Sequence, residues 1–478
     1  MSQLKQNDMQ EHAGRFPMKR QISIFLHLFV LLALSACGIN PASPSPTPSP
    51  TATPKPSRLP DQDLVKALLV RVVDEERLVP GIVVGMIADD PQERWVVGYG
   101  RLSATDERAP DSDTVFEIGS VTKVFTGTLL AQAVVNGEVQ LDDPISMYLP
   151  EGVTAPEYEG RSITLLDLGT HTSGLPRDAI NPYSSTIDQM YAYLSGHRLT
   201  RAPGSTYEYS NYGFSLLGDL LARHAGQADY EALLLERITR PLGMDSTRIV
   251  LTPDMESRLA APHLNYSVVT NSFNVPVFDG AGMIRSTAND MLTFLAANMG
   301  MIETDLQPAI QLANTPQRPT DGLGYIGLGW GLPQSGKGMH THSGQTHGYR
   351  SFLAWDSERR IGIVILANAA INIDGIGFFL MSESARLMDT ILQVDPQVLA
   401  TYAGRYQFPD GLVVTIRVDG TRIFTQVPNQ PEIGLIAISE NQFIVFDSEI
   451  TFYTNENGEV DRLVLVGIGG TYEAKKVP

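Results

Sequence analysis

The chain has 478 residues, of which 43% are hydrophobic and 18% are charged. This length accommodates about two or three domains, and the composition is that of a globular protein with a sizeable core. A formal net charge of -18 argues against a nucleic-acid partner, because binding to phosphates requires a basic surface. The acidity mostly reflects solubility, so it indicates no particular substrate.

The sequence has a single cysteine, Cys37, which can neither form an intrachain disulfide nor hold a metal cluster by itself. It is preceded by Met18-Lys19-Arg20 and by an apolar run, Ile22 to Leu34, of about 13 residues, whereas a spanning helix needs roughly 20. The segment Leu34-Ser35-Ala36-Cys37-Gly38 resembles a bacterial lipoprotein signal, in which the cysteine after the cleavage site becomes lipidated. We therefore expect residues 1–37 to be a lipoprotein signal peptide and the mature chain to be extracytoplasmic. The alternative is an uncleaved signal anchor.

Residues 38–60 are rich in Pro, Ser and Thr, which predicts an extended linker between the lipid and the folded part. A helix follows, because apolar residues recur at helical spacing between Leu64 and Val72. Two apolar runs, 82–88 and 94–100, are separated by the turn-forming Asp89-Asp90-Pro91, so they predict a β-hairpin.

A second pair of apolar runs, 351–355 and 361–367, lies far downstream and is followed by a helix expected at about 377–394. A hairpin near each end, each flanked by a helix, predicts one sheet built from both ends of a domain. The stretch between them, about residues 120–310, shows mostly helical patterns with Gly and Pro breaks. We expect it to be a helical region inserted into the sheet domain.

Near residue 395 the pattern changes to period two. The runs 413–418 and 422–427 flank Asp419-Gly420, which is a strong hairpin turn, and several short strands continue to the end. Such strands over about 80 residues predict a small antiparallel barrel or sandwich at 398–478.

The stretch most informative about chemistry is Ser120-Val121-Thr122-Lys123, which is followed by a helical run to Val135. Ser120 therefore lies at a helix N-terminus, and Lys123 shares its helix face. A serine hydroxyl becomes a nucleophile when a base takes its proton, and a partly desolvated lysine with a lowered pKa can be that base. The spacing alone is a weak signal, because a serine that caps a helix is the ordinary explanation.

A second element, Tyr209-Ser210-Asn211, precedes a helical run from Phe214. Residues two apart on an extended segment project to the same side, so Tyr209 and Asn211 can face one cleft. The tyrosine could relay protons with a lysine, and the amide could bind a substrate carbonyl. Taken singly, the tripeptide is as well explained by a buried tyrosine and a turn asparagine.

A third element, His342-Ser343-Gly344, lies just before the second hairpin and is expected to form an edge strand beside the cleft. Gly344 would let a substrate approach the backbone closely. The N–H groups of Gln345 and Ser120 could form an oxyanion hole, which is usually among the largest catalytic contributions. The ordinary alternative for this fragment is a glycine-rich surface loop.

Taken together, Ser120-x-x-Lys123, Tyr209-x-Asn211 and His342-x-Gly344 resemble the motifs of the penicillin-recognising serine hydrolases, for which S-x-x-K and K-T-G are signatures. The tyrosine in the second motif is typical of the class C β-lactamase branch. The resemblance covers residues 61–393 and implies an α/β fold (an α+β sandwich). This fold has an antiparallel, five-stranded-type sheet, flanking helices and an all-helical lobe. The region 398–478 resembles lipocalin-like domains appended to some relatives. Further stretches that match the class C β-lactamase branch are 165–176, 202–205, 241–244 and 281–291.

The resemblance implies that Ser120 attacks a lactam, amide or ester carbonyl and forms an acyl-enzyme that water hydrolyses. Lys123 and Tyr209 would share proton removal and transfer. Asn211 would position the substrate, while the N–H groups of Ser120 and Gln345 hold the oxyanion. No metal or organic cofactor is expected, and His171, His342 and His347 are interpreted as site or packing residues.

One departure concerns the substrate. The third motif usually begins with a lysine that helps bind a substrate carboxylate, whereas this chain has His342, which is mostly neutral at pH 7. Related esterases and D-amino-acid peptidases often carry histidine there. The sequence therefore leaves open a β-lactamase, a D-amino-acid peptidase, carboxypeptidase or esterase, and a non-catalytic penicillin-binding or sensor lipoprotein.

The third of these functions is disfavoured, because a pure binder has no use for Lys123 and Tyr209 together. The expected partners are a small-molecule or peptide substrate and, through Cys37, a membrane. The oligomeric state stays open.

Overall fold

The computed structural model describes residues 57–89, 92–178, 185–264, 267–268, 276–320, 322, 324–386, 392–428, 432–445, 448–467 and 470–478. The predicted signal peptide, its Cys37 and most of the predicted linker lie outside these described residues. None of the helices in the described ranges is long and apolar enough to cross a membrane.

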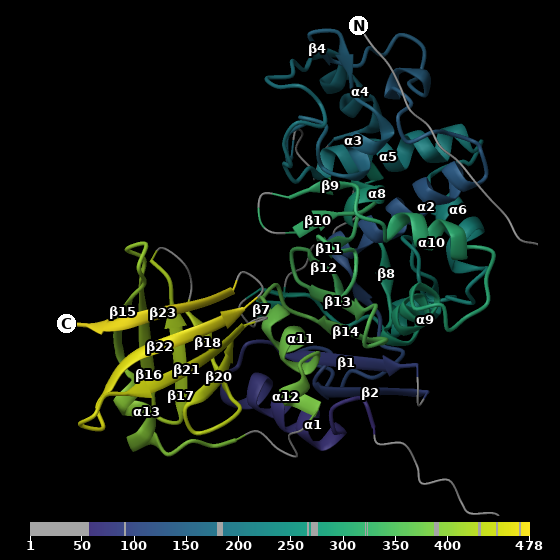
Figure 1. Ribbon diagram of the computed structural model, residues 1–478. Helices are drawn as coiled ribbons and strands as arrows, with labels where there is room; N and C mark the ends of the chain where they lie inside the picture. Colours follow the sequence, from purple (N-terminus) through teal and green to yellow (C-terminus); the bar gives the residue numbers. More distant parts are fainter. Residues whose placement is uncertain are drawn as a thin grey trace, which may run out of the picture. The chain divides into compact units, whose positions relative to one another are not determined.

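The central sheet brings together strands from both ends of the larger domain, as the sequence predicts (Figure 1). Strand β1 (Gly81–Ala88) is buried along its length and pairs antiparallel with β2 (Glu93–Gly100) on one side. On its other side it pairs with β14 (Ile361–Ala367), with Val84 opposite Ile365. The sheet continues through β13 (Arg350–Asp356) to β12 (Met339–Gln345).

Three short strands extend the sheet beyond β12, which is therefore not the outermost strand that the sequence predicts. They are β11 (Gly331–Pro333), β10 (Gly324–Ile326) and β9 (Arg318–Pro319). Among the described residues, β11 pairs with β12 only where Gly331 lies opposite Thr341. The part of β12 from residue 342 onward is thus unpaired on that side, and this part faces the cleft described below.

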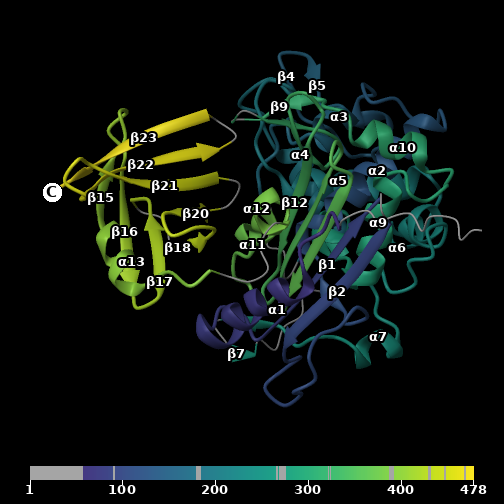
Figure 2. The ribbon, with the colours of Figure 1, turned by 60° about the horizontal axis from the view of Figure 1, so that its bottom comes forward.

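Residues that alternate along β1 point into two different cores, because successive strand side chains lie on opposite faces. Val83 packs into the core that contains α9 (Ala288–Asn298). Val84 packs into the core that contains α1 (Gln62–Val70) and α11 (Asp374–Leu380). Figure 2 shows these helices against the sheet. Helices on both faces explain why these strands read as continuous apolar runs rather than as an alternating pattern.

The helix expected at 377–394 is wrong in its extent. The structure has α11 and, after a break, α12 (Glu383–Arg386). Ser382 lies at the break, where its hydroxyl accepts a hydrogen bond of 3.2 Å from the Ala385 N–H. This side-chain cap starts a new helix, because Ser satisfies a backbone donor that has no partner within the helix.

The middle of the chain forms the predicted helical lobe around helix α2 (Thr122–Val135). This helix is buried on nearly all sides, as its continuous apolar sequence indicates. A Cβ at Gly127 would lie 1.9 Å from the Leu328 carbonyl oxygen, so glycine permits this close packing. The other helices between α1 and α11 are α3 (Leu165–Gly169), α4 (Ile187–Gly196), α5 (Asn211–His224), α6 (Tyr230–Leu234), α7 (Pro253–Ser257), α8 (Asp279–Gly282) and α10 (Gln307–Ala313).

A buried ion pair lies immediately before α2. Strand β3 (Phe116–Glu117) pairs with β8 (Arg285–Ser286), which places Glu117 opposite Arg285. Their side chains are 5% and 6% exposed, and an Arg285 nitrogen lies 3.1 Å from Glu117 Oε1. The Arg285 guanidinium also donates to the Ile249 carbonyl oxygen at 2.7 Å.

Breaking this pair is expected to destabilise the fold. Glu117→Ala should lower the free energy of unfolding by about 3–5 kcal/mol, because it removes one partner of a buried ion pair. Urea titration at neutral pH measures this change. The double variant Glu117→Met/Arg285→Met removes both charges and should recover most of the loss. A loss below about 1 kcal/mol in the single variant would contradict the expectation.

The C-terminal part is a separate antiparallel sheet with helix α13 (Pro396–Tyr402). The edges of this sheet are β18 (Ile433–Gly434) and β19 (Ile436–Ala437), which are separated by Leu435 alone. A sheet with neighbouring residues at its two edges must curl round, so it is nearly closed and barrel-like, as predicted. Between these edges lie β17 (Arg422–Gln426), β16 (Val413–Asp419), β15 (Gly404–Gln407), β23 (Gly470–Val477), β22 (Val460–Gly467), β21 (Ser448–Thr454) and β20 (Gln442–Val445).

Candidate active site

Ser120 lies in a 3-10 turn, Gly119–Val121, that leads directly into α2. Gly119 has φ +51°, and a Cβ there would lie 2.7 Å from the Gln345 nitrogen. Glycine therefore satisfies both the left-handed conformation and the close approach to β12. The Ser351 hydroxyl donates to the Ile118 carbonyl oxygen at 2.7 Å and holds the turn from β13. The sequence alone does not indicate this support.

Lys123 lies on the first turn of α2, and its side chain is 0% exposed. Its Nζ lies 3.1 Å from Ser120 Oγ, 2.8 Å from Asn211 Oδ1 and 2.7 Å from the Ala281 carbonyl oxygen. Burial holds the pKa of Lys123 well below its usual range, and the positive charge of Arg177 acts in the same direction. Lys123 Nζ thus contacts both Ser120 of the first motif and Asn211 of the second.

Tyr209 lies beside the same two groups. Its hydroxyl is hydrogen-bonded to Ser120, and Lys123 Nζ lies 4.9 Å from the centre of its ring. Burial raises the pKa of Tyr209 above its ordinary value, and the hydrogen bond with Ser120 opposes this rise. The two pKa shifts therefore favour a neutral lysine next to a protonated tyrosine.

Asn211 reaches the cleft by a different route from the predicted one. It is the first residue of α5, and Ser210 caps this helix by accepting a hydrogen bond of 2.8 Å from the Gly213 N–H. Tyr209 and Asn211 thus flank a helix cap rather than alternate along an extended segment. Asn211 Nδ2 donates to Asp178 Oδ1 at 2.8 Å, which turns the amide oxygen toward Lys123. Asp178 carries no recognisable motif, so the sequence does not reveal it.

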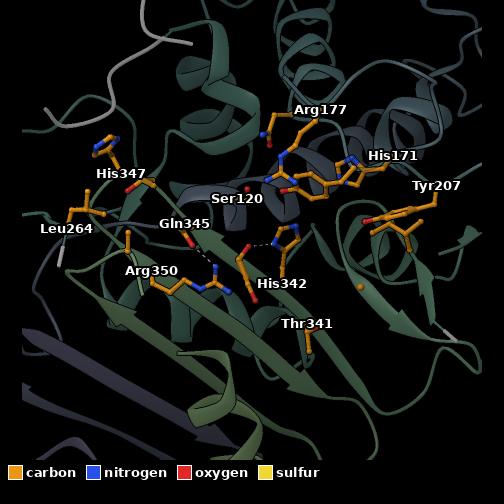
Figure 3. A pocket seen from close by; sticks show the side chains of 17 residues that line it. Ser120, His171, Arg177, Tyr207, Leu264, Thr341, His342, Gln345, His347 and Arg350 are labelled. Carbon is orange, nitrogen blue, oxygen red and sulfur yellow. Dashed lines mark hydrogen bonds between the residues drawn. The ribbon is translucent and has the colours of Figure 1, made fainter. Parts of the chain in front are cut away.

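His342 lies on the part of β12 that borders the cleft. Its Nδ1 lies 2.8 Å from the Ser343 carbonyl oxygen, which can only accept, so Nδ1 carries the proton (Figure 3). Burial and the nearby charge of Lys123 lower the pKa of His342 to about 3. The ring is therefore neutral, and its Nε2 is a hydrogen-bond acceptor rather than a cation.

Gly344 packs closely against the turn before Ser120. A Cβ at this position would lie 1.9 Å from the Ile118 carbonyl oxygen and 2.3 Å from Ser351 Oγ. The glycine therefore lets β12 pack against the turn before Ser120, while close approach of a substrate at Gly344 stays a prediction. This packing also brings the backbone of Gln345 against Gly119, next to Ser120. The oxyanion hole of Ser120 and Gln345 stays a prediction.

A cleft of about 760 Å³ lies beside Ser120, Tyr209 and His342 (Figure 3). Arg350 points into it, but its guanidinium binds Asp374 through two nitrogens, and the two side chains are 14% and 16% exposed. Arg177 lies at the cleft with its side chain 67% exposed and its guanidinium 5.2 Å from the Tyr209 ring centre. In the described part of the chain, no group of three or more His, Cys, Asp or Glu could hold a metal ion. The lining includes Ser120, His171, Arg177, Tyr207, Tyr209, Asn211, His342, Gln345, His347 and Arg350.

Two family models match the chain. Residues 67–375 match the model described as Beta-lactamase. Residues 392–475 match the model described as Domain of unknown function (DUF3471). The lipocalin-like character of the C-terminal domain therefore stays a prediction.

Several characterised relatives match the larger domain. The D-alanyl-D-alanine-carboxypeptidase/endopeptidase AmpH of Escherichia coli K12 is 32% identical over 303 residues, which cover 59% of this chain and 78% of that protein. A beta-lactamase of the same organism is 28% identical and covers 64% of this chain and 88% of its own length. The crystal structure of a beta-lactamase/D-alanine carboxypeptidase from Yersinia pestis superposes with a TM-score of 0.55 at 27% identity, covering 65% of this chain and 94% of its own.

Proposed function

Because the chain belongs to the beta-lactamase family, we propose that it is a class C-type serine hydrolase that forms an acyl-enzyme on Ser120. Its proposed reaction is hydrolysis of a β-lactam or a related amide bond. The observation that carries this proposal is the 3.1 Å contact between Lys123 Nζ and Ser120 Oγ. The hydrogen bond of Tyr209 to the same hydroxyl supports it.

The hydrogen bonds of Lys123 support its assignment as the base. The oxygens of Asn211 and Ala281 can only accept, so they take two N–H groups from Nζ. A neutral amine has two N–H groups and one lone pair, and the lone pair is then left for the Ser120 proton. A tyrosine hydroxyl can donate as well as accept, so protonated Tyr209 can donate a hydrogen bond to Ser120 Oγ.

In the proposed acylation, the Ser120 proton passes to Lys123 while Oγ forms a bond to the substrate carbonyl carbon. Collapse of the tetrahedral intermediate breaks the carbon–nitrogen bond, and the leaving nitrogen takes the Tyr209 proton. The Lys123 ammonium then reprotonates Tyr209. In deacylation, water attacks the ester carbonyl, with Lys123 or Tyr209 as the base.

A second candidate function, hydrolysis of D-amino-acid peptides or small esters, is favoured by the charges of the cleft. His342 is neutral, and Arg350 is already bound to Asp374. The position where a lysine usually binds a substrate carboxylate thus offers only an acceptor. The relative named a D-alanyl-D-alanine-carboxypeptidase/endopeptidase is consistent with this candidate.

A lysine at position 342, as in the usual third motif, should shift substrate specificity toward lactams that carry a carboxylate. His342→Lys is expected to raise kcat/KM for benzylpenicillin about tenfold or more relative to kcat/KM for a neutral nitrophenyl ester, because a hydrogen bond to a charged group contributes about 1.5–3 kcal/mol. Steady-state kinetics on both substrates measure this ratio. His342→Gln, which adds no charge, should not raise it, and an equal change for both substrates in His342→Lys would contradict the charge argument.

The direct test of the proposed function is intact-mass spectrometry with a penicillin, a cephalosporin, a nitrophenyl ester and a D-alanyl peptide. Addition of the acyl mass at Ser120, located by peptide mapping, is the expected result. Its lifetime separates a hydrolase from a lipoprotein that is acylated once and released slowly. Absence of any adduct or turnover with the whole panel would refute the proposal.

We also propose that Cys37 carries a lipid that holds the enzyme at an extracytoplasmic membrane surface. The small residues before Cys37 and the Pro-rich linker after it support this location. The Cys37→Ala variant is expected to move from the detergent phase to the aqueous phase in Triton X-114 partitioning. Unchanged partitioning would contradict lipidation.

A further inference from the structure

His171 contacts the Tyr209 segment in three ways. Its carbonyl oxygen accepts a hydrogen bond of 2.7 Å from the Glu208 N–H, and its Nδ1 accepts one of 3.0 Å from the Ser210 N–H. Its ring stacks on the Tyr209 ring, with centres 4.3 Å apart and planes at 29°. One residue thus binds the backbone on both sides of Tyr209 and also contacts its side chain.

Keeping a histidine here costs the fold free energy in two ways. His171 has φ +58°, a conformation that non-glycine residues rarely adopt. Because Nδ1 accepts, a neutral ring carries its proton on Nε2. This atom is buried and has no hydrogen-bond partner among the described residues. Burial lowers the pKa of His171 well below its usual range, which keeps the ring neutral and Nδ1 able to accept. Such costs often mark positions that matter for function.

We propose that His171 is a positioning residue that holds the Tyr209 phenol against Ser120 and thereby sets the rate of acylation. This inference rests on the proposed function, in which Tyr209 passes a proton to the leaving group. The segment before Tyr209 lies between Gly204 and α5 and has no helix or strand of its own. The three contacts with His171 therefore hold Tyr209 in position, as the regular hydrogen bonds of α2 hold Lys123 in position.

The test is a double-mutant cycle between His171 and Tyr209. His171→Phe keeps an aromatic ring but removes the acceptor for Ser210. It should lower the acylation rate constant about 10- to 100-fold, because a displacement of about 1 Å at a reacting group can slow a reaction by up to about 100-fold. In the Tyr209→Phe background, the same substitution should have no further effect, since no hydroxyl remains to be positioned. A structural defect alone would lower the rate equally in both backgrounds.

Two further variants separate positioning from general disruption. His171→Asn tolerates the left-handed conformation and keeps a side-chain acceptor, so it should lose less activity than His171→Phe. His340 is a matched control, because it is 2% exposed and its ring centre lies 4.3 Å from that of Trp355, without lining the cleft. The acylation rate of His340→Phe should stay within about twofold of the wild type.

Hydrogen exchange of the Ser210 amide gives a readout that needs no activity. This amide should exchange at least about tenfold faster in His171→Phe than in the wild type, because it has lost its acceptor. Equal rate losses in both Tyr209 backgrounds, or an unchanged acylation rate in His171→Phe, would overturn the positioning role. Failure of the wild-type enzyme to be acylated by any probe would instead overturn the proposed function, and His171 would then lose its catalytic significance as well.

Discussion

Ser120→Ala is expected to lose all covalent labelling by a penicillin or an activated ester and at least about 10⁴-fold of any turnover. The substitution removes the oxygen that forms the acyl bond, and among the described cleft residues Lys123 and Tyr209 are the groups that contact it. Intact-mass spectrometry measures the labelling, and steady-state kinetics measure the turnover.

The fold of this variant should be preserved, because the hydroxyl that is removed is small and lines the cleft. Its free energy of unfolding should stay within about 1 kcal/mol of the wild type. Ser112→Ala is a suitable control, since the Ser112 hydroxyl contacts the exposed Asp113 away from the cleft. Full labelling of Ser120→Ala, with the adduct mapped to another residue, would remove Ser120 from the mechanism.

The parts of the site that the sequence predicts well are those that local geometry controls. Positions i and i+3 of a helix lie on one face, so Ser120-x-x-Lys123 predicts a contact that the structure has at 3.1 Å. The two hairpins and their common sheet follow from apolar runs of the right length and their turn residues. The helical pattern of the region that joins them is also clear from the sequence, and Gly and Pro residues mark where its helices end.

The parts that the sequence does not predict depend on residues far apart in the chain. The packing of Gly344 against Ile118 becomes visible only when β12 lies beside the Ser120 turn. The binding of Arg350 by Asp374 changes how many free cations the cleft offers, and neither residue belongs to a motif. The left-handed conformation of His171 cannot be predicted from the sequence, because histidine, unlike glycine, does not indicate a positive φ.

Lys123→Arg is expected to lower the acylation rate constant by about 10²–10⁴-fold, which is the range of contributions from general base catalysis. The arginine has no lone pair to accept the Ser120 proton, because its guanidinium stays protonated and positively charged in proteins. Labelling by a neutral ester, followed by mass spectrometry across the pH range, measures the rate constant. Lys66→Arg, an exposed lysine on α1, is the control.

The pH dependence distinguishes a lost base from a distorted site. The reactive form of Lys123 is the neutral amine, which is populated above its pKa, so the wild-type rate should rise with pH. Because burial lowers this pKa, the rise should level off well below the pH at which an ordinary lysine, with a pKa of 10.5, loses its proton. Lys123→Arg and the uncharged Lys123→Met should both lack this rise, because neither can titrate in that range. If the rise persisted in both variants at reduced amplitude, a group other than Lys123 would be the base. Tyr209 could not be that group, because its raised pKa would place the rise at a much higher pH.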